Sequence, residues 1–161
     1  MPDFKNLNAL FKYMEKTQPI DLEKLGNEIK GWLRNNVRVL WYERSYTPKF
    51  YERTFELIDS ITCSKAKKIN KGEYEIKIYF DTDKINPYSG ENGMWSQHQS
   101  ITNGADVSSF IPLWIEEGQN SSMFSYEGVH PVRITKEEIK EDDYIKTRLK
   151  ELLEHRGYRV E

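Results

Sequence analysis

The sequence is poor in cysteine, with Cys63 alone among 161 residues, so no disulfide can form within one chain. Structural disulfides are typical of oxidising compartments, and nothing here indicates one. No apolar stretch approaches the roughly 20 residues that a membrane-spanning helix needs. The first residues, MPDFKNLNALFKYMEK, carry charges throughout and lack the apolar centre of a signal peptide. These absences predict a soluble, cytosolic protein.

An excess of either charge is also missing. The chain has 24 Lys and Arg against 26 Asp and Glu, a net charge of -2. Proteins that bind duplex DNA usually carry a basic surplus that neutralises phosphates. The charge balance therefore argues against a dedicated duplex binder.

Recognisable metal-site spacings are absent from the sequence. The histidines, His98, His130 and His155, lie far apart and form no paired motif. The triplet 81–83, Asp-Thr-Asp, begins like a calcium loop, but the Gly at the sixth position and the acid at the twelfth are missing. We expect no metal and no cofactor.

The motifs of common enzyme classes are missing too. The sequence has no GxSxG, no phosphate-binding glycine loop and no dinucleotide fingerprint. The spacing of Cys63 and His98 does not indicate a catalytic pair, and a small buried cysteine is the expectation. Glu116 and Glu117 are neighbours, which face different ways on a helix. We predict that the protein is not an enzyme.

Helical periodicity dominates the first third of the chain. Apolar residues recur at helical spacing over 4–14, and Pro19 is expected to interrupt this first helix. A second helix is expected to begin at Asp21 and to end near Arg44, because Pro48 disfavours helix at the residue before it. A third helix is predicted over 49–62. Its buried residues are expected to be Tyr51, Phe55, Ile58 and Ile61.

The middle of the chain changes to a β pattern. Apolar and polar residues alternate over 73–80, after a tight Asn-Lys-Gly turn at 70–72, which predicts an antiparallel hairpin over 64–80. The following 81–105 has no periodicity, although it contains Trp95. Loops of this length are usually functional or mobile. We expect this segment to be an arm that orders against its own domain or a neighbour.

The last third returns to helix. A short helix is predicted to have Pro112 in its first turn and to end at Gly118. A polar loop with an aromatic tip follows. The last helix is expected to begin with a capping box, Thr135 and Glu138, and to end at Gly157. The pattern predicts an α+β fold in a single domain, 1–161: helices over 1–63, a small antiparallel sheet built on the hairpin over 64–80, the arm 81–105, and, over 106–161, a long C-terminal helix packed on one face.

The stretch YERSYTPKFYERTFEL, residues 42–57, is rich in aromatic residues and arginine. Three interpretations are open: it stacks on nucleic acid, contacts a protein partner, or packs two helices together. Rigid aromatics and arginine are enriched at protein interfaces. We favour a double role in which some members pack inward and others contact a partner.

The order of these parts resembles the neck and tail-completion family of tailed bacteriophages. That family has a pattern like Pro…Arg-Thr-Gly-x-Leu-x-x-Ser-Ile, matched here by Pro48 and residues 53–61, with Phe55 in place of the Gly. A later Glu-Gly segment of the family is matched by residues 111–118, with Pro112 and Leu113 replacing its small residue.

The resemblance implies a non-enzymatic virion structural protein, made in the host bacterial cytoplasm and encoded by a phage or prophage. It would form a homo-oligomeric ring in the neck or at the top of the tail, as a head-tail joining protein or tail terminator. Its neighbours would be head-connector and tail-tube proteins, with genome DNA passing through the lumen without specific binding. The expected subunit or partner contacts are Tyr42, Arg44, Tyr46, Arg53, Trp95, Phe124 and Tyr126.

An alternative function is a single-strand nucleic-acid binding accessory protein. Lys65, Lys67, Lys68 and Lys71 form a basic cluster beside tyrosines, and single-strand binders combine cationic grooves with stacking rings. Glutamates interleave with these lysines and would cancel much of their field. The ring function predicts that Trp95→Ala and Arg53→Ala leave the monomer folded but weaken assembly.

Overall fold

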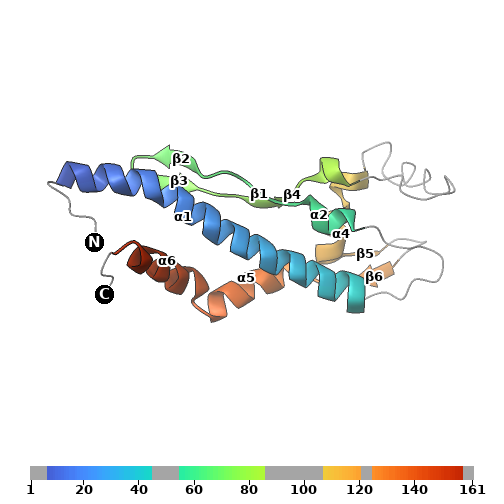
Figure 1. Ribbon diagram of the computed structural model, residues 1–161. Coiled ribbons are helices and arrows are strands. Elements are labelled where there is room, and N and C mark those ends of the chain that lie inside the picture. Colours follow the sequence, from blue (N-terminus) through green and yellow to red (C-terminus); the bar gives the residue numbers. More distant parts are fainter. Residues whose placement is uncertain (1–6, 45–54, 86–106, 121–124, 158–161) are drawn as a thin grey trace. The chain divides into compact units, whose positions relative to one another are not determined.

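A computed structural model describes residues 7–44, 55–85, 107–120 and 125–157 (Figure 1). Its residues group into two compact units. Unit 1 comprises Met1–Lys30, Cys63–Ile78 and Lys136–Glu161, and unit 2 comprises Gly31–Thr62 and Tyr79–Thr135. Neither unit is continuous in sequence, so the single domain over 1–161 stays a prediction.

The fold is α+β, as the sequence pattern predicts. The helices are α1 (Leu7–Asn36), η1 (Val37–Arg44), α2 (Glu56–Ser60), η2 (Thr82–Lys84), η4 (Val107–Ser109), α4 (Ile111–Glu117), α5 (Pro131–Glu141) and α6 (Tyr144–His155). The strands are β1 (Ile61–Cys63), β2 (Lys67–Asn70), β3 (Glu73–Glu75), β4 (Ile78–Phe80), β5 (Gly118–Asn120) and β6 (Ser125–Glu127). Within the described ranges they form three two-stranded pairs, β1 with β4, β2 with β3 and β5 with β6.

Helix α1 continues through Pro19, so the expected break there is wrong. Proline removes one backbone N–H and leaves the carbonyl four residues earlier without its helical donor. That carbonyl belongs to Glu15, and the hydroxyl of Tyr74 donates to it at 3.0 Å. A strand residue thus replaces the missing donor, which explains why the helix tolerates the proline. The helical path runs on to Arg44, the last described residue before 55, so the predicted end there stays a prediction; residues 37–44 form the π-helix η1.

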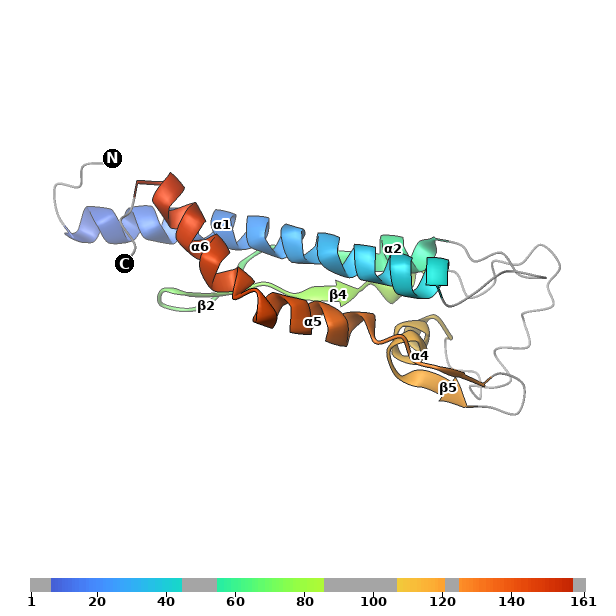
Figure 2. The same cartoon turned by 90° about the horizontal axis from the view of Figure 1, so that it is seen from below.

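Within unit 1, α1 lies between the β2–β3 hairpin and α6 (Figures 1 and 2). At 3.6 residues per turn, Glu15, Glu23 and Gly26 share one side of the helix, and these residues contact the hairpin or the segments flanking it. Asp21 and Glu28 lie roughly opposite and bind α6. The two sides of α1 therefore hold two segments that are distant in sequence.

The hairpin has the predicted tight turn, with Gly72 at φ 76°. Lys67 pairs with Glu75 and Lys68 with Tyr74, and the register shifts before Asn70. The expected single strand over 73–80 is divided into β3 and β4. Gly26 lies close to the hairpin's C-terminal flank, because a Cβ there would lie 2.5 Å from Ile76 Cδ1 and would require that side chain to shift. A larger residue at this position would therefore require the Ile76 and Cys63 side chains to rearrange.

Unit 2 has an aliphatic core. Its buried hydrophobic residues are Leu33, Val37, Leu57, Ile58, Ile61, Ile85 and Ile115. A buried hydrogen bond joins Asn36 Nδ2 to Thr135 Oγ1 at 2.9 Å, and the Thr135 hydroxyl donates to the Pro131 carbonyl at 2.7 Å. Asn36 and Thr135, two buried polar residues of this core, therefore bind each other.

The predicted third helix is partly wrong. Ile58 and Ile61 are buried as expected, but Ile61 begins strand β1 and Phe55 is 60% exposed. Residues 49–54 lie outside the described part of the chain. Two predictions for α4 are confirmed: Pro112 lies in its first turn and Gly118, at φ 89°, follows its end.

The C-terminal region also differs from the expectation. Thr135 lies inside α5 and bonds back to the preceding turn, so it is not an N-cap and the capping box is wrong. The expected long helix is two helices, because Asp143 adopts a left-handed conformation between α5 and α6. The predicted end is confirmed, with Gly157 at φ 86° after α6.

Candidate functional site

The first candidate site is the aromatic and arginine stretch 42–57. Tyr42 is half-buried and stacks on Phe55, with ring centroids 5.0 Å apart and planes 18° apart. Arg44 is exposed at the end of η1. Tyr42 therefore packs against Phe55, and much of the Phe55 side chain stays exposed to solvent.

The other predicted contact residues are not brought together by the described structure. Tyr46, Arg53, Trp95 and Phe124 lie outside the described residues. Tyr126 is described only by its backbone, in β6 opposite Gln119. Tyr42 and Arg44 are therefore the two members of the predicted contact set whose side chains can be placed.

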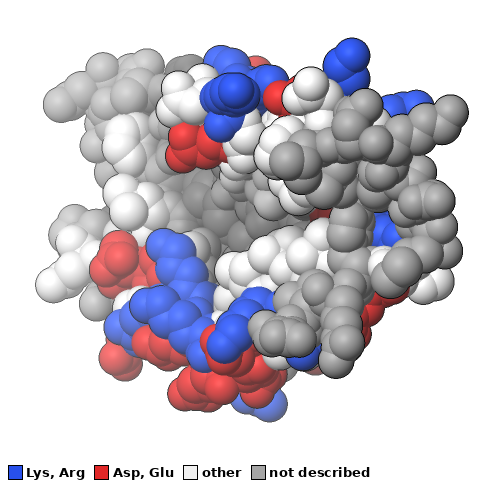
Figure 3. Space-filling model, turned by 90° about the vertical axis from the view of Figure 1, so that its left-hand side faces the viewer, with Lys and Arg blue, Asp and Glu red and all other residues white. Residues whose placement is uncertain are grey.

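The second candidate is the basic cluster of the hairpin. Lys68 Nζ lies 3.0 Å from Glu15 Oε1, a hydrogen bond that raises the pKa of the lysine. Lys65 Nζ lies 3.5 Å from Glu23 Oε2. On the face drawn in Figure 3, basic and acidic side chains also lie next to one another. Two of the cluster's charges are therefore paired with carboxylates of α1.

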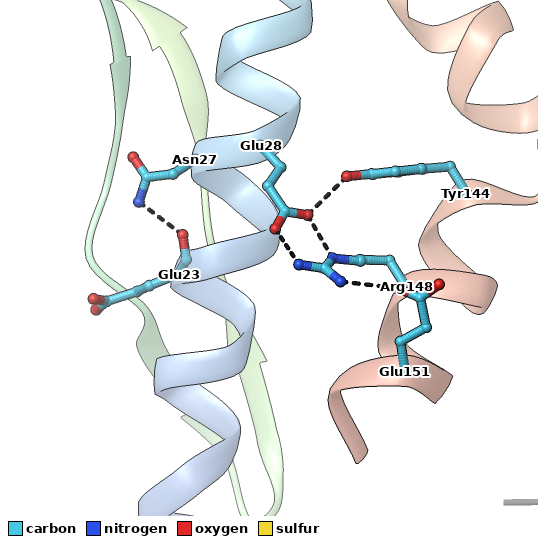
Figure 4. A network of polar contacts seen from close by, with 6 residues as sticks. All are labelled: Glu23, Asn27, Glu28, Tyr144, Arg148 and Glu151. Atoms are coloured by element: carbon cyan, nitrogen blue, oxygen red, sulfur yellow. Dashed lines mark hydrogen bonds and ion pairs between the residues drawn. The ribbon is translucent and has the colours of Figure 1, made fainter. Parts of the chain in front are cut away.

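The third candidate was not predicted from the sequence: a set of ion pairs that joins α1 to α6. The carboxylate of Glu28 accepts two bonds from one guanidinium, from Arg148 Nε at 2.8 Å and Nη2 at 2.6 Å (Figure 4). The Tyr144 hydroxyl donates to Glu28 at 2.7 Å, and Arg148 Nη1 donates to Glu151 at 2.8 Å. Four hydrogen bonds therefore join four residues and fix their relative orientation.

A second guanidinium pair lies further along the same two helices. Arg156 donates to Asp21 from Nε at 2.6 Å and from Nη2 at 2.8 Å. Asp21 is buried, at 6% exposure. Two-pronged pairs of this kind are charge-assisted and fix orientation as well as distance. We call Asp21, Glu28, Tyr144, Arg148 and Arg156 the polar clamp.

The pKa values in the polar clamp follow from these contacts. The bond from Arg148 lowers the pKa of Glu28 below its ordinary value of 4.5. Burial, and then the bond to Glu28, raise the pKa of Tyr144 to about 12. The carboxylate is therefore charged and the phenol neutral at physiological pH, the states in which all of these bonds form.

No local signal in the sequence could have revealed the polar clamp. Glu28 and Arg148 are 120 residues apart, and Asp21 and Arg156 are 135 apart. Each is one of many charged residues on amphipathic helices. Their pairing follows from the packing of the two helices against each other.

Metal and membrane features are absent from the residues that the structure describes. In that part of the chain no group of three or more His, Cys, Asp or Glu side chains is arranged to hold a metal ion. Asp81 instead pairs with Lys84 at 3.0 Å. Cys63 is half-buried, and burial raises the pKa of its thiol. Among the described helices, none is both long enough and apolar enough to cross a membrane.

The chain matches a known protein family. No curated protein and no solved structure matches the chain. The model of the YomN family matches residues 4–155, nearly the whole chain. The family name is associated with phages and prophages, which points to a phage origin. The chain therefore belongs to the YomN family.

Proposed function

We propose that this protein is a non-enzymatic virion structural protein, which assembles into a homo-oligomeric ring in the neck or at the top of a phage tail. The ring joins the head connector to the tail tube. The observation that supports this most is the match of the phage-associated YomN model over residues 4–155. The order of elements in the chain, which resembles neck and tail-completion proteins, supports the finer assignment.

The aromatic stack of unit 2 supports a role in protein contact. Phe55 is 60% exposed although it stacks on Tyr42. A large exposed ring held in place by a second ring offers apolar area at little entropic cost. Interfaces are enriched in aromatics and arginine. A head-to-tail contact of this kind closes into a ring when the rotation between subunits closes.

The test is the state of assembly in solution. Light scattering over a range of concentrations, followed by negative-stain microscopy, should show closed rings, either alone or with tail components. A monomer that never assembles under either condition contradicts the proposal.

Phe55→Ala tests the contact itself. We expect it to leave the protein folded, apart from about 1 kcal/mol of lost ring stacking, and to weaken assembly. Leu113→Ala is the matched control, because Leu113 is 55% exposed but lies outside the stretch 42–57. Equal effects of the two changes would contradict the contact role of the stretch.

The alternative is a single-strand nucleic-acid binding protein, in which the exposed Lys67 and Lys71 would contact phosphates. It predicts binding to a single-stranded oligonucleotide that weakens steeply as salt rises. Fluorescence anisotropy at two salt concentrations distinguishes the two functions. Tight, salt-dependent binding by a protein that does not form rings would favour the alternative.

A further inference from the structure

The joint between α5 and α6 has an unusual conformation for its sequence. Asp143 adopts φ 49° and ψ 30°, in the left-handed region that favours glycine. Its side chain makes no capping bond to α6. Other L-residues in this region carry a steric cost, which asparagine and aspartate reduce through local hydrogen bonds. The bend at Asp143 is therefore held under some strain.

The sequence at the joint suits an uninterrupted helix. From Val132 to Arg156 the chain contains neither glycine nor proline. The backbone bonds at the bend, Asp142 N to Glu138 O and Asp143 N to Lys140 O, are both 3.2 Å. A straight helix over the whole of α5 and α6 would span roughly 37 Å at 1.5 Å per residue. The bend is thus imposed by what α6 binds.

Few side chains of α6 are fully buried. Leu152 is the one residue of α6 that is buried, and Ile145 is 43% exposed. The polar clamp supplies the directional contacts, with both guanidinium pairs reaching α1. Such pairs re-form equally well with an identical α1 from another molecule, since every donor and acceptor is the same. A straightened α6 would make the same polar contacts if a second copy supplied the α1 surface.

We propose that α6 is an exchanged arm: in the assembled protein the joint at Asp143 straightens and α6 binds α1 of a neighbouring copy through the polar clamp. Exchange of an identical element is a low-cost route to assembly, and short strained hinges favour it. The inference rests on the proposed ring, for which it names the contact. An arm that passes from each copy to the next gives the head-to-tail connection that a ring needs.

Charge exchange across the polar clamp tests the arm directly. In Glu28→Arg an arginine faces Arg148, and in Arg148→Glu two glutamates face each other, so each variant alone should assemble poorly. Mixed, they should form complexes that contain both variants, because every exchanged contact is then a pair of opposite charges. Native mass spectrometry detects these complexes. The double variant Glu28→Arg, Arg148→Glu in one chain is the folding control.

A matched control comes from unit 2. Arg34 and Asp59 pair at 2.9 Å within one copy, with no exchange proposed. A mixture of Arg34→Glu and Asp59→Arg should therefore gain no mixed complexes beyond those formed by random association. The exchanged arm is wrong if the clamp variants also mix only at random, or if each variant alone assembles as well as the natural protein does. Either result leaves the proposed ring unaffected. If the natural protein never assembles, both proposals fail.

Substitutions at the hinge give an independent test that leaves the clamp intact. Asp143→Gly relieves the strain of the bend and should lower the assembly constant, whereas Asp143→Ala disfavours the bend and should raise it. We expect the two variants to differ by about tenfold or more, from the cost of a left-handed alanine. Light scattering at matched concentrations measures the difference. Equal assembly of the two variants, or the reverse order, overturns the proposal.

Discussion

At the scale of single residues, Tyr74 compensates for a proline inside a helix. Pro19 cannot donate to the Glu15 carbonyl, and the Tyr74 hydroxyl does so from strand β3. One side chain therefore both preserves α1 and attaches the hairpin to it.

This pairing predicts a specific coupling. Tyr74→Phe should lower the free energy of unfolding by about 1 to 2 kcal/mol, because the Glu15 carbonyl is left without its donor. In a Pro19→Ala background the helix supplies that donor again, so the same change should cost clearly less. Urea denaturation of the four proteins in this cycle measures the coupling. Equal costs in the two backgrounds would show that the hydroxyl does not replace the helical bond.

The ionisation of Glu28 gives a second prediction for a single residue. Its folded-state pKa is lowered, chiefly by Arg148, so its stabilising effect is present above pH 4.5 and is lost as the pH falls through the lowered value. Glu28→Gln should therefore flatten the decline in stability on acidification below about pH 5. Denaturation at a series of pH values measures the slope.

The matched control for that change is Glu154→Gln. The Glu154 carboxylate lies 3.9 Å from Lys150 Nζ, on an exposed face of α6. Exposed pairs of this kind contribute little, so the control should keep the acid slope of the natural protein. A slope that changes equally in both variants would mean that the polar clamp is not the source of the pH dependence.

At the scale of elements, α5 receives its N-terminal cap from another helix. The carboxylate of Glu116, in α4, accepts bonds from the backbone N–H of Val132 at 2.8 Å and of Arg133 at 3.0 Å. The first N–H groups of a helix have no partner within it, and a negative charge there also suits the helix dipole. The sequence suggested Thr135 as the cap because the capping-box pattern is local, whereas Glu116 reaches α5 only through the fold.

Removal of this cap should destabilise unit 2. Glu116→Ala is expected to cost about 1 to 2 kcal/mol and to speed hydrogen exchange at Val132 and Arg133. Glu117→Ala, at the exposed neighbouring position, should change stability by less than about 0.5 kcal/mol. Denaturation and amide exchange measure the two effects. Similar losses in the two variants would exclude a capping role for Glu116.

Gly128 explains how α4 and α5 come close enough for that cap. A Cβ at this position would lie 2.3 Å from the Glu116 carbonyl oxygen and 2.6 Å from the Gly118 nitrogen. These are backbone atoms, which cannot move aside as a flexible side chain does. The segment that precedes α5 can therefore approach α4 this closely only because residue 128 has no side chain.

At the scale of the whole molecule, the chain passes between the two units several times. Helix α1 contributes to both, since unit 1 ends at Lys30 and unit 2 begins at Gly31 within it. Unfolding of either unit therefore disturbs α1, which the other unit also needs. Because the chain connects the two units several times, we expect them to fold and unfold together.

We therefore expect a single unfolding transition. Calorimetric and van't Hoff enthalpies should agree, and probes in the two units should report coincident midpoints. Tryptophan fluorescence follows Trp32, Trp41 and Trp114 in unit 2 together with Trp95, and amide exchange follows both units. Two separated transitions would instead show that the units are independent domains.

The sequence by itself determined the features that depend on near neighbours. Apolar spacing indicated that the first third is helical, although not where its helices divide; Asn70 to Gly72 indicated the hairpin turn, and Gly118 and Gly157 indicated two helix ends. These signals are local, because a glycine at positive φ or an alternation of period two needs no distant partner. The α+β class follows from them.

The tertiary structure decided what local rules leave open or predict wrongly. Pro19 remains helical because Tyr74 supplies a donor, and Glu116 replaces the capping box as the cap of α5. The candidate sites differ in the same way. Composition alone indicated the stretch 42–57, whereas the pairing of Asp21 with Arg156 depends on the packing of α6 against α1. Contacts between residues more than a hundred positions apart cost chain entropy that only the packed fold repays, so no local pattern records them.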